Sequence, residues 1–311
     1  MVDSDRSPAE RGPFAFGVDP SAPAEVEDAA DVRARVAQAL AGVERVLPVM
    51  SGKGGVGKSA VAVNLAVALA RRGERVGILD ADLQGPSVAK MLGLRGQPLR
   101  IGGDERLRPV PGPLGIAVQS LDFFLEGNRG PDWEGDRAEG ATFRSAIEEA
   151  ALADLLGRTA WGELDTLLVD LPPGADRLPA LARWLPEASA ALVVTIPTEV
   201  SLLAVERAIA RARAARIALI GLVENLASVS CQKCGADSPL YPEAQVARFA
   251  EDQDLPLVAR IPFDPTLARA GDAGTPWPGE ASPASPAARA FAGLAERLET
   301  LHHDAMKRDS W

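Results

Sequence analysis

The feature that most constrains the fold is the segment VMSGKGGVGKSAVAVNLA at residues 49–66. An apolar run ends at Met50, a frame of the form G-x-x-x-x-G-K-[ST] occupies residues 52–59, and an apolar helical pattern begins at Lys58. This order is typical of a phosphate-binding loop, because glycines let backbone N–H groups turn inward and a helix N-terminus attracts anions. A glycine-rich turn without a ligand is the alternative, which the complete motif in its strand–helix context disfavours.

Apolar runs of strand length alternate with helical patterns along the rest of the chain. Strands are predicted at residues 43–50, 75–79, 115–121, 166–171, 190–196, 217–225 and 257–261. Helices are predicted at residues 58–72, 143–156, 199–215, 244–253 and 285–301. Nearly continuous apolar strands separated by helices indicate an α/β fold, a doubly wound and mostly parallel sheet with helices on both faces.

The predicted domain boundaries follow the composition. Residues 1–30 are rich in proline, alanine and acidic residues without apolar periodicity, which predicts a disordered tail. Residues 31–45 predict a short lead-in helix, residues 46–301 the P-loop domain, and residues 302–311 a polar tail.

Charge and hydropathy exclude several classes of protein. A net charge of -10 argues against a nucleic-acid binder, because affinity for phosphate backbones comes largely from clustered lysine and arginine. The longest apolar runs fall far short of the roughly 18 residues that cross a membrane. The N-terminal segment also lacks the basic region and apolar core of a signal peptide. We therefore expect a cytoplasmic protein that has neither nucleic acid nor a membrane as its partner.

Two strand ends carry carboxylates that phosphoryl chemistry can use. Asp80 and Asp82 follow the second predicted strand in ILDADLQGPS, and Asp170 ends the fourth in TLLVDLPPG. Carboxyl ends of parallel strands meet at one edge of a sheet, so we expect these side chains beside the loop. Lys58 would then reach the phosphates, while Ser59, Asp80 and Asp170 would hold Mg²⁺. Turn residues and helix caps are the alternative for each aspartate taken alone.

Longer segments carry a more specific resemblance. SGKGGVGKS at residues 51–59 resembles the deviant Walker A motif of the MinD and ParA class of ATPases. Within that class, DADLQGPS, WGELDTLLVDLPPG, GLVENLA, CQKCG and RIPFDPTLARAGDAGTP resemble the Mrp/ApbC family of iron-sulfur cluster carriers, over about residues 43–301. The resemblance implies an ATP-hydrolysing homodimer that takes a [4Fe-4S] cluster from a donor scaffold and delivers it to client apoproteins.

The resemblance also implies roles for single residues. Lys53 would reach across the dimer to the partner's nucleotide, Asp82 would orient the attacking water, and Asn225 would contact adenine. The residues expected to act in catalysis are Lys53, Lys58 and Asp82. The residues expected to bind the nucleotide are Gly52, Lys53, Gly54, Gly55, Val56, Gly57, Lys58, Ser59, Ala60 and Asn225. The chain departs from the family at residues 175–177, which read ADR where TGD is usual, and at Ala204, where an aspartate is usual.

The only cysteines, Cys231 and Cys234, form a C-x-x-C motif. Two thiolates can neither complete a tetrahedral metal site nor hold a four-iron cluster, which needs about four ligands. A second copy of the chain would supply the others, so that nucleotide and cluster share one symmetric interface. Zinc is the rival occupant, and a redox-active pair is a further alternative. The alternative functions are a MinD- or ParA-like positioning ATPase and a regulatory ATP-binding protein with a structural zinc.

Overall fold

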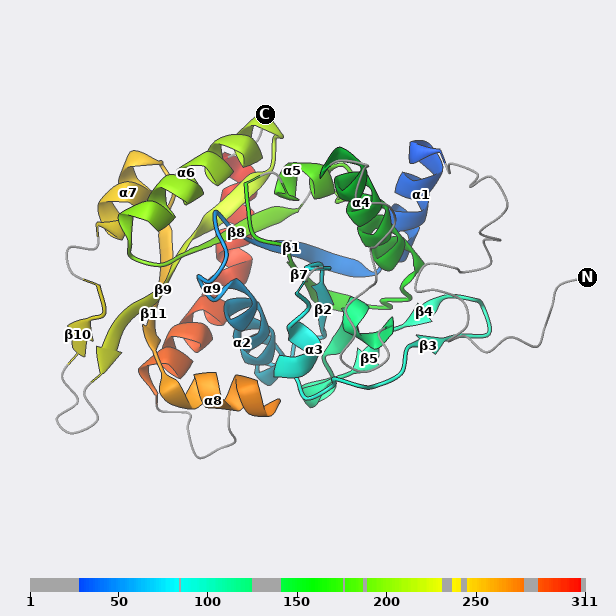
Figure 1. Cartoon of the computed structure of the whole chain (residues 1–311), viewed down its shortest axis with the longest axis horizontal. Coiled ribbons are helices and arrows are strands. Elements are labelled where there is room, and N and C mark those ends of the chain that lie inside the picture. The colour runs from blue at the N-terminus through cyan, green and yellow to red at the C-terminus, as the bar shows by residue number, and fades with distance from the viewer. Residues whose placement is uncertain are drawn as a thin grey trace, which may run out of the picture.

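The computed structural model describes eight stretches of the chain, residues 28–83, 85–124, 141–175, 177–186, 189–230, 237–241, 245–276 and 285–308. Within them, nine strands form one central sheet in the order β10-β9-β8-β1-β7-β2-β6-β5, with β11 beside β9 (Figure 1). All pairs are parallel except those of β10 with β9 and β5 with β6. The predicted doubly wound, mostly parallel α/β fold is therefore confirmed.

The strands of the sheet are β1 (Val43–Ser51), β2 (Val76–Asp80), β5 (Val110–Pro111), β6 (Ala117–Ser120), β7 (Leu164–Asp170), β8 (Ala190–Thr195), β9 (Ala218–Ser230), β10 (Asp237–Pro239) and β11 (Leu257–Phe263). Strands at the centre of the sheet, such as β2 and β8, are buried along their whole length, whereas the edge strand β10 is exposed. A separate two-stranded hairpin consists of β3 (Arg100–Ile101) and β4 (Leu107–Arg108).

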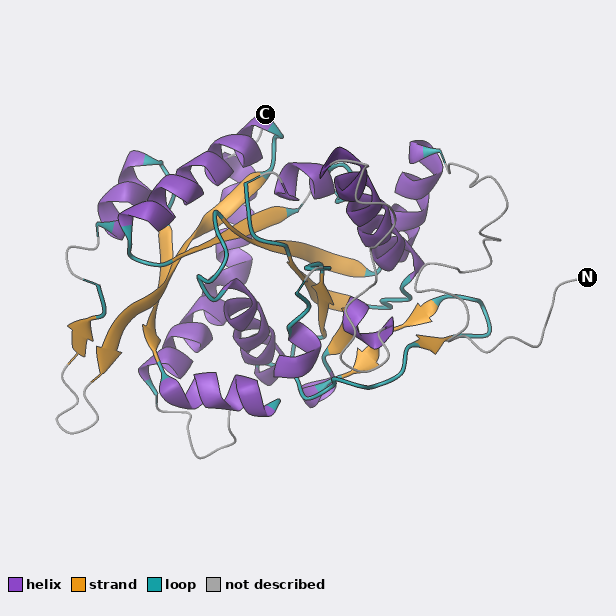
Figure 2. Cartoon of the chain, viewed as in Figure 1, coloured by secondary structure: helices purple, strands orange, loops and turns teal. Residues whose placement is uncertain are grey.

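The helices surround the sheet (Figure 2). They are α1 (Ala29–Ala39), α2 (Lys58–Arg71), α3 (Val88–Met91), α4 (Ala141–Arg158), α5 (Arg177–Ala182), α6 (Glu199–Ala214), α7 (Val246–Asp252), α8 (Pro265–Ala273) and α9 (Pro286–Arg308). Two short 3-10 turns, at Pro113–Gly115 and Leu121–Phe124, flank β6. None of the helices in the described stretches combines the length and apolarity that crossing a bilayer requires.

Each face of the sheet has its own apolar core. On one face, Val49, Ile78 and Leu192 pack with the buried sides of α2, α3 and α9. On the other face, their chain neighbours, such as Met50 and Leu79, pack with α1, α4, α5, α6 and α7. Successive side chains of a strand point to opposite faces, so a strand buried on both sides must be apolar at nearly every position. This explains the continuous apolar runs of the sequence.

Some element boundaries differ from the predicted ones. The lead-in helix predicted at 31–45 ends at Ala39, and Val43 already pairs with Leu164 of β7. Helix α9 continues to Arg308, through most of the segment expected to be a polar tail, because Ala305 is buried in the core on the α2 side of the sheet. Residues 1–27 lie outside the described stretches, so the tail predicted at 1–30 is tested only at its end, where α1 begins at Ala29.

Candidate functional site

The glycine-rich loop runs from the end of β1 to the start of α2. Gly55 and Gly57 have φ angles of 78° and 79°, in the left-handed region that costs other residues about 1–2 kcal/mol. Gly57 is also the N-cap of α2. At Gly52, an added Cβ would lie 2.3 Å from the carbonyl carbon of Ala204 and 2.4 Å from the nitrogen of Val205. The loop therefore rests directly on the backbone of α6.

Lys58 and Asp170, which the sequence assigned to the phosphates and to Mg²⁺, meet in the interior. Lys58 is only 6% exposed, and its ammonium group forms an ion pair with Oδ1 of the fully buried Asp170. The same ammonium lies 3.4 Å from Oγ of Ser59. Burial raises the pKa of Asp170, although the charge of Lys58 opposes this rise. Lys58 and Asp170 thus form a buried ion pair at the start of α2.

Asp80 lies beside Asp170 because β2 and β7 pair in register at these two residues. One Asp80 oxygen accepts hydrogen bonds from the backbone nitrogens of Ser87, at 2.9 Å, and Val88, at 3.0 Å. Burial, reinforced by the negative charge of Asp170, raises the pKa of Asp80 to about 7. Asp80 therefore anchors the segment that enters α3, whose N-cap is Ser87, and its expected role as a Mg²⁺ ligand stays a prediction.

Asp82 is bound to the same anchored segment. Its backbone nitrogen donates to Oδ1 of Asp80 at 3.2 Å, and its own Oδ1 accepts from the nitrogen of Gly85 at 3.2 Å. Its negative charge also contributes to the raised pKa of Asp170. The structure therefore brings Asp80, Asp82, Asp170 and Lys58 together at the sheet edge, as the sequence predicted.

The donor set around Asp170 fits a hard cation. Oδ2 of Asp170 is buried and has no hydrogen-bond partner, and the nearby Ser59 hydroxyl acts to lower the pKa of the same carboxyl group. Oxygen donors of this kind suit Mg²⁺. Across the described stretches, however, no three His, Cys, Asp or Glu side chains form a metal-binding group. A cation here would need hydroxyl, phosphate or water oxygens as its remaining ligands.

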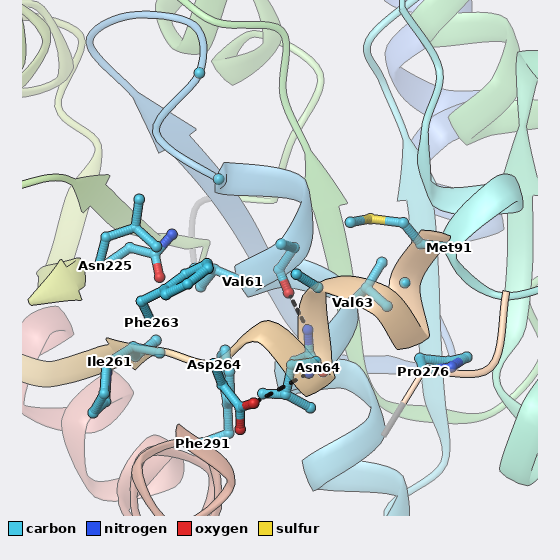
Figure 3. A pocket seen from close by; sticks show the side chains of 18 residues that line it. Val61, Val63, Asn64, Met91, Asn225, Ile261, Phe263, Asp264, Pro276 and Phe291 are labelled. Carbon is cyan, nitrogen blue, oxygen red and sulfur yellow. Dashed lines mark hydrogen bonds between the residues drawn. The ribbon is translucent and has the colours of Figure 1, made fainter. Parts of the chain in front are cut away.

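A cavity of about 190 Å³ opens next to the loop (Figure 3). Its walls come from the loop, α2, β9, α8, α9 and the end of β11. The residues that define it include Val61, Asn64, Asn225, Ile261, Phe263 and Phe291. Asp264 accepts from the nitrogens of Thr266, at 2.8 Å, and Leu267, at 3.4 Å, and so caps α8 at the rim. The cavity is mostly apolar and of a size suited to a small planar group.

Of the residues that line this cavity, the sequence assigned Gly55, Gly57, Ala60 and Asn225 to nucleotide binding, and only Asn225 to the adenine. Many of the unassigned lining residues, such as Ile261 and Phe263, belong to RIPFDPTLARAGDAGTP, a segment quoted for its resemblance without roles for its residues, and others, such as Asn64 and Phe291, come from α2 and α9. The order and direction of the predicted strands could have identified these residues. β11 is parallel to β9, so its end must reach the same sheet edge as Asn225.

Beyond Asn225, β9 continues to Ser230 and leads towards the cysteine motif. Ser230 pairs with Asp237 of β10 in an antiparallel ladder. Cys231 and Cys234 lie between these two strands in the chain and fall outside the described residues. The structure therefore describes β9 and β10, the two strands that flank the motif.

The fold, the loop and the paired lysine and aspartate define a P-loop NTPase. A family model described as ParA, NUBPL iron-transfer P-loop NTPase, matches residues 42–299. The chain therefore belongs to this family, which confirms the class suggested by its motifs.

Individual relatives agree with this assignment. The iron-sulfur cluster carrier protein of Saccharolobus solfataricus is 39% identical over 265 residues, which cover 85% of this chain and 86% of that protein. The protein of the same name from Aquifex aeolicus is 37% identical over 84% of this chain and 68% of its own length.

Solved structures show the same architecture. An ADP complex of a nucleotide-binding protein from Archaeoglobus fulgidus has a TM-score of 0.66 and 34% identity, over 78% of this chain and 91% of that one. The cell division ATPase MinD of Pyrococcus furiosus has a TM-score of 0.55 over 83% of this chain and 99% of its own, and its 24% identity shows the fold alone.

Proposed function

We propose that this chain is an ATP-binding and ATP-hydrolysing carrier that delivers an iron-sulfur cluster to apoproteins. The observation that carries the proposal is the course of β9. This strand contacts the phosphate loop through Asn225 and leads, after Ser230, into the C-x-x-C motif. The family match and the names of the relatives support the same function.

The nucleotide half of the proposal uses the loop and the buried charges. Backbone N–H groups of residues 52–60 would hold the phosphates, and Lys58 would exchange Asp170 for a phosphate oxygen. Ser59, Asp80 and Asp170 would hold Mg²⁺, which would neutralise charge on the phosphates, and Asp80 would also fix the segment that enters α3. Asp82 would orient the attacking water. The adenine would enter the apolar cavity beside Phe263.

The dimer half of the proposal concerns the surface beside the loop. Lys53 is partly exposed at the loop, next to the contact between Gly52 and α6. On that helix, Val200 is 66% exposed and Leu203 is 59% exposed. Apolar side chains this exposed favour a protein partner. A second copy bound here would receive Lys53 at its nucleotide. Its own Lys53 would in turn reach the nucleotide of the first copy.

The cluster is cargo in this scheme, and its ligands follow from the cysteine count. Each chain offers Cys231 and Cys234, whereas a [4Fe-4S] cluster takes about four ligands, so two chains would hold one cluster between them. Free thiols persist in a reducing compartment, so the proposed location is the cytoplasm, and the proposed partners are donor scaffolds and client apoproteins.

Anaerobic reconstitution tests this function. Iron, acid-labile sulfide and zinc per chain would be measured together with the mass in solution, for the parent protein and for Cys231→Ser and Cys234→Ser. We expect about one four-iron cluster per dimer, lost in either cysteine variant but kept in Lys58→Ala. Zinc that resists exchange would favour the structural-zinc alternative, and a monomer holding a complete cluster would refute the shared site.

A further inference from the structure

Asn225 lies at the junction of the phosphate loop, the apolar cavity and the outer part of β9. It is 7% exposed, and its Nδ2 donates a hydrogen bond of 2.8 Å to the carbonyl oxygen of Val56. Val56 belongs to the glycine-rich loop and is itself buried. One donor of the Asn225 amide is therefore committed to the backbone of the loop.

The contact with the loop is close as well as directional. An added Cβ at Gly57 would lie 2.4 Å from Nδ2 of Asn225, so only glycine leaves room for the amide. In a trans peptide the C=O and the following N–H point in opposite directions. Anchoring the Val56 carbonyl at Asn225 therefore aims the N–H of Gly57, the N-cap of α2, away from Asn225.

The strand is bent at the next residue. Leu226 has a φ of 55°, an uncommon conformation for a residue with a side chain. The pairing of β9 with β11 shifts register over the same stretch, between Ile261 and Phe263. Such strain persists only where the surroundings enforce it, and it often marks functional positions. Here it immediately follows the residue that holds the loop.

We propose that Asn225 is a positioning residue, which orients the Val56–Gly57 peptide so that the loop can hold phosphate. This inference rests on the proposed nucleotide function and differs from the adenine contact expected from the family resemblance. An adenine contact would act only on ligands that contain the base. A positioning role acts on every ligand that carries the phosphates.

Inorganic tripolyphosphate separates the two roles because it has no base. Affinities for ATP and for tripolyphosphate would be measured by calorimetry for the parent protein, Asn225→Ala, Asn225→Asp and the control Phe263→Ala. We expect Asn225→Ala to weaken both ligands by the same factor, about tenfold, the upper range for one hydrogen bond. Asn225→Asp should weaken both further, since a carboxylate repels the Val56 carbonyl and the phosphates. Phe263→Ala should weaken ATP alone.

Loss of ATP affinity in Asn225→Ala with unchanged tripolyphosphate affinity would overturn the inference and restore the adenine contact. The amide resonance of Gly57 in the ligand-free protein provides a second readout. A positioning role shifts this resonance in Asn225→Ala and leaves it in place in Phe263→Ala, and an unshifted resonance in Asn225→Ala contradicts the proposal. Failure of the parent protein to bind either ligand would instead refute the proposed function.

Discussion

Replacing Gly52 by alanine should move the phosphate loop off α6. The added methyl group would meet the backbone of Ala204 and Val205 at 2.3–2.5 Å, whereas ordinary contacts begin at 3.4 Å. The loop must therefore shift by about 1 Å, because helix backbone atoms cannot rotate aside as a side chain can. Overpacking of this kind costs about 3 kcal/mol when the obstructing atoms are fixed.

Two other glycines of the loop serve as matched controls. At Gly54 the nearest atom to an added Cβ is 3.8 Å away, so Gly54→Ala should change the free energy of unfolding by less than about 0.5 kcal/mol. At Gly55 the space is open, but its φ of 78° predicts a cost of about 1 kcal/mol for alanine.

Urea unfolding without nucleotide measures these free energies directly. We expect the loss of stability to rank Gly52→Ala above Gly55→Ala above Gly54→Ala, and ATP affinity should fall most in Gly52→Ala because its loop is displaced. Equal stabilities for Gly52→Ala and Gly54→Ala would refute the tight contact between the loop and α6.

Three further predictions concern the charged residues of the site. Lys58→Ala should abolish ATP binding. Lys53→Ala should spare ATP binding and reduce turnover, because Lys53 is proposed to act at the partner's nucleotide. Unaltered turnover in Lys53→Ala would exclude that role. Asp82→Asn should slow ATP hydrolysis by about 100-fold and leave ATP affinity intact, since orienting water affects only the chemical step, and parental turnover would show that Asp82 is only a turn residue. The raised pKa of Asp80, about 7, means that the folded protein keeps a proton that the unfolded chain releases above about pH 4. The free energy of unfolding of the nucleotide-free protein should therefore fall as pH rises from 4 to 7. Urea unfolding at pH 5, 6, 7 and 8 measures this dependence, which Asp80→Asn should flatten. A pH profile of the variant parallel to that of the parent protein would contradict the raised pKa of Asp80.

The fold was predictable because its main signals are local. Strand-length apolar runs and the loop motif place the seven predicted strands within a few residues of the observed ones, except that β9 runs on to Ser230. That extension depends on pairing with β10 and β11, which lie later in the chain. The end of α1 was less predictable, since the helical pattern of residues 31–45 overlaps the predicted strand that begins at Val43, and in the structure Val43 pairs with β7 and the helix ends at Ala39.

The candidate site was predictable in composition more than in geometry. Strand order puts Asp80 and Asp170 side by side, as parallel strands require. The bond from Asn225 to Val56 depends on how a bent strand meets a loop far away in the sequence, and residue type alone carries no such information. The short helices α3, α5 and α8 were also missed, because four to nine residues give too little periodicity to detect.

The neighbours of β9 change along its length, and this gives the strand a gradient of local stability. Its first part, from Ala218 to Glu224, is paired with β8 inside the sheet, whereas its last residues, from Ser228, pair with β10, an exposed strand of three residues, and at Val229 with the end of β11. Segments held by few buried contacts open at lower free energy than the core. Amide exchange should therefore quicken towards Ser230. Under the proposed function, the end of β9 near Ser230 can open to release the cluster while the hydrogen bond from Asn225 to Val56 stays formed.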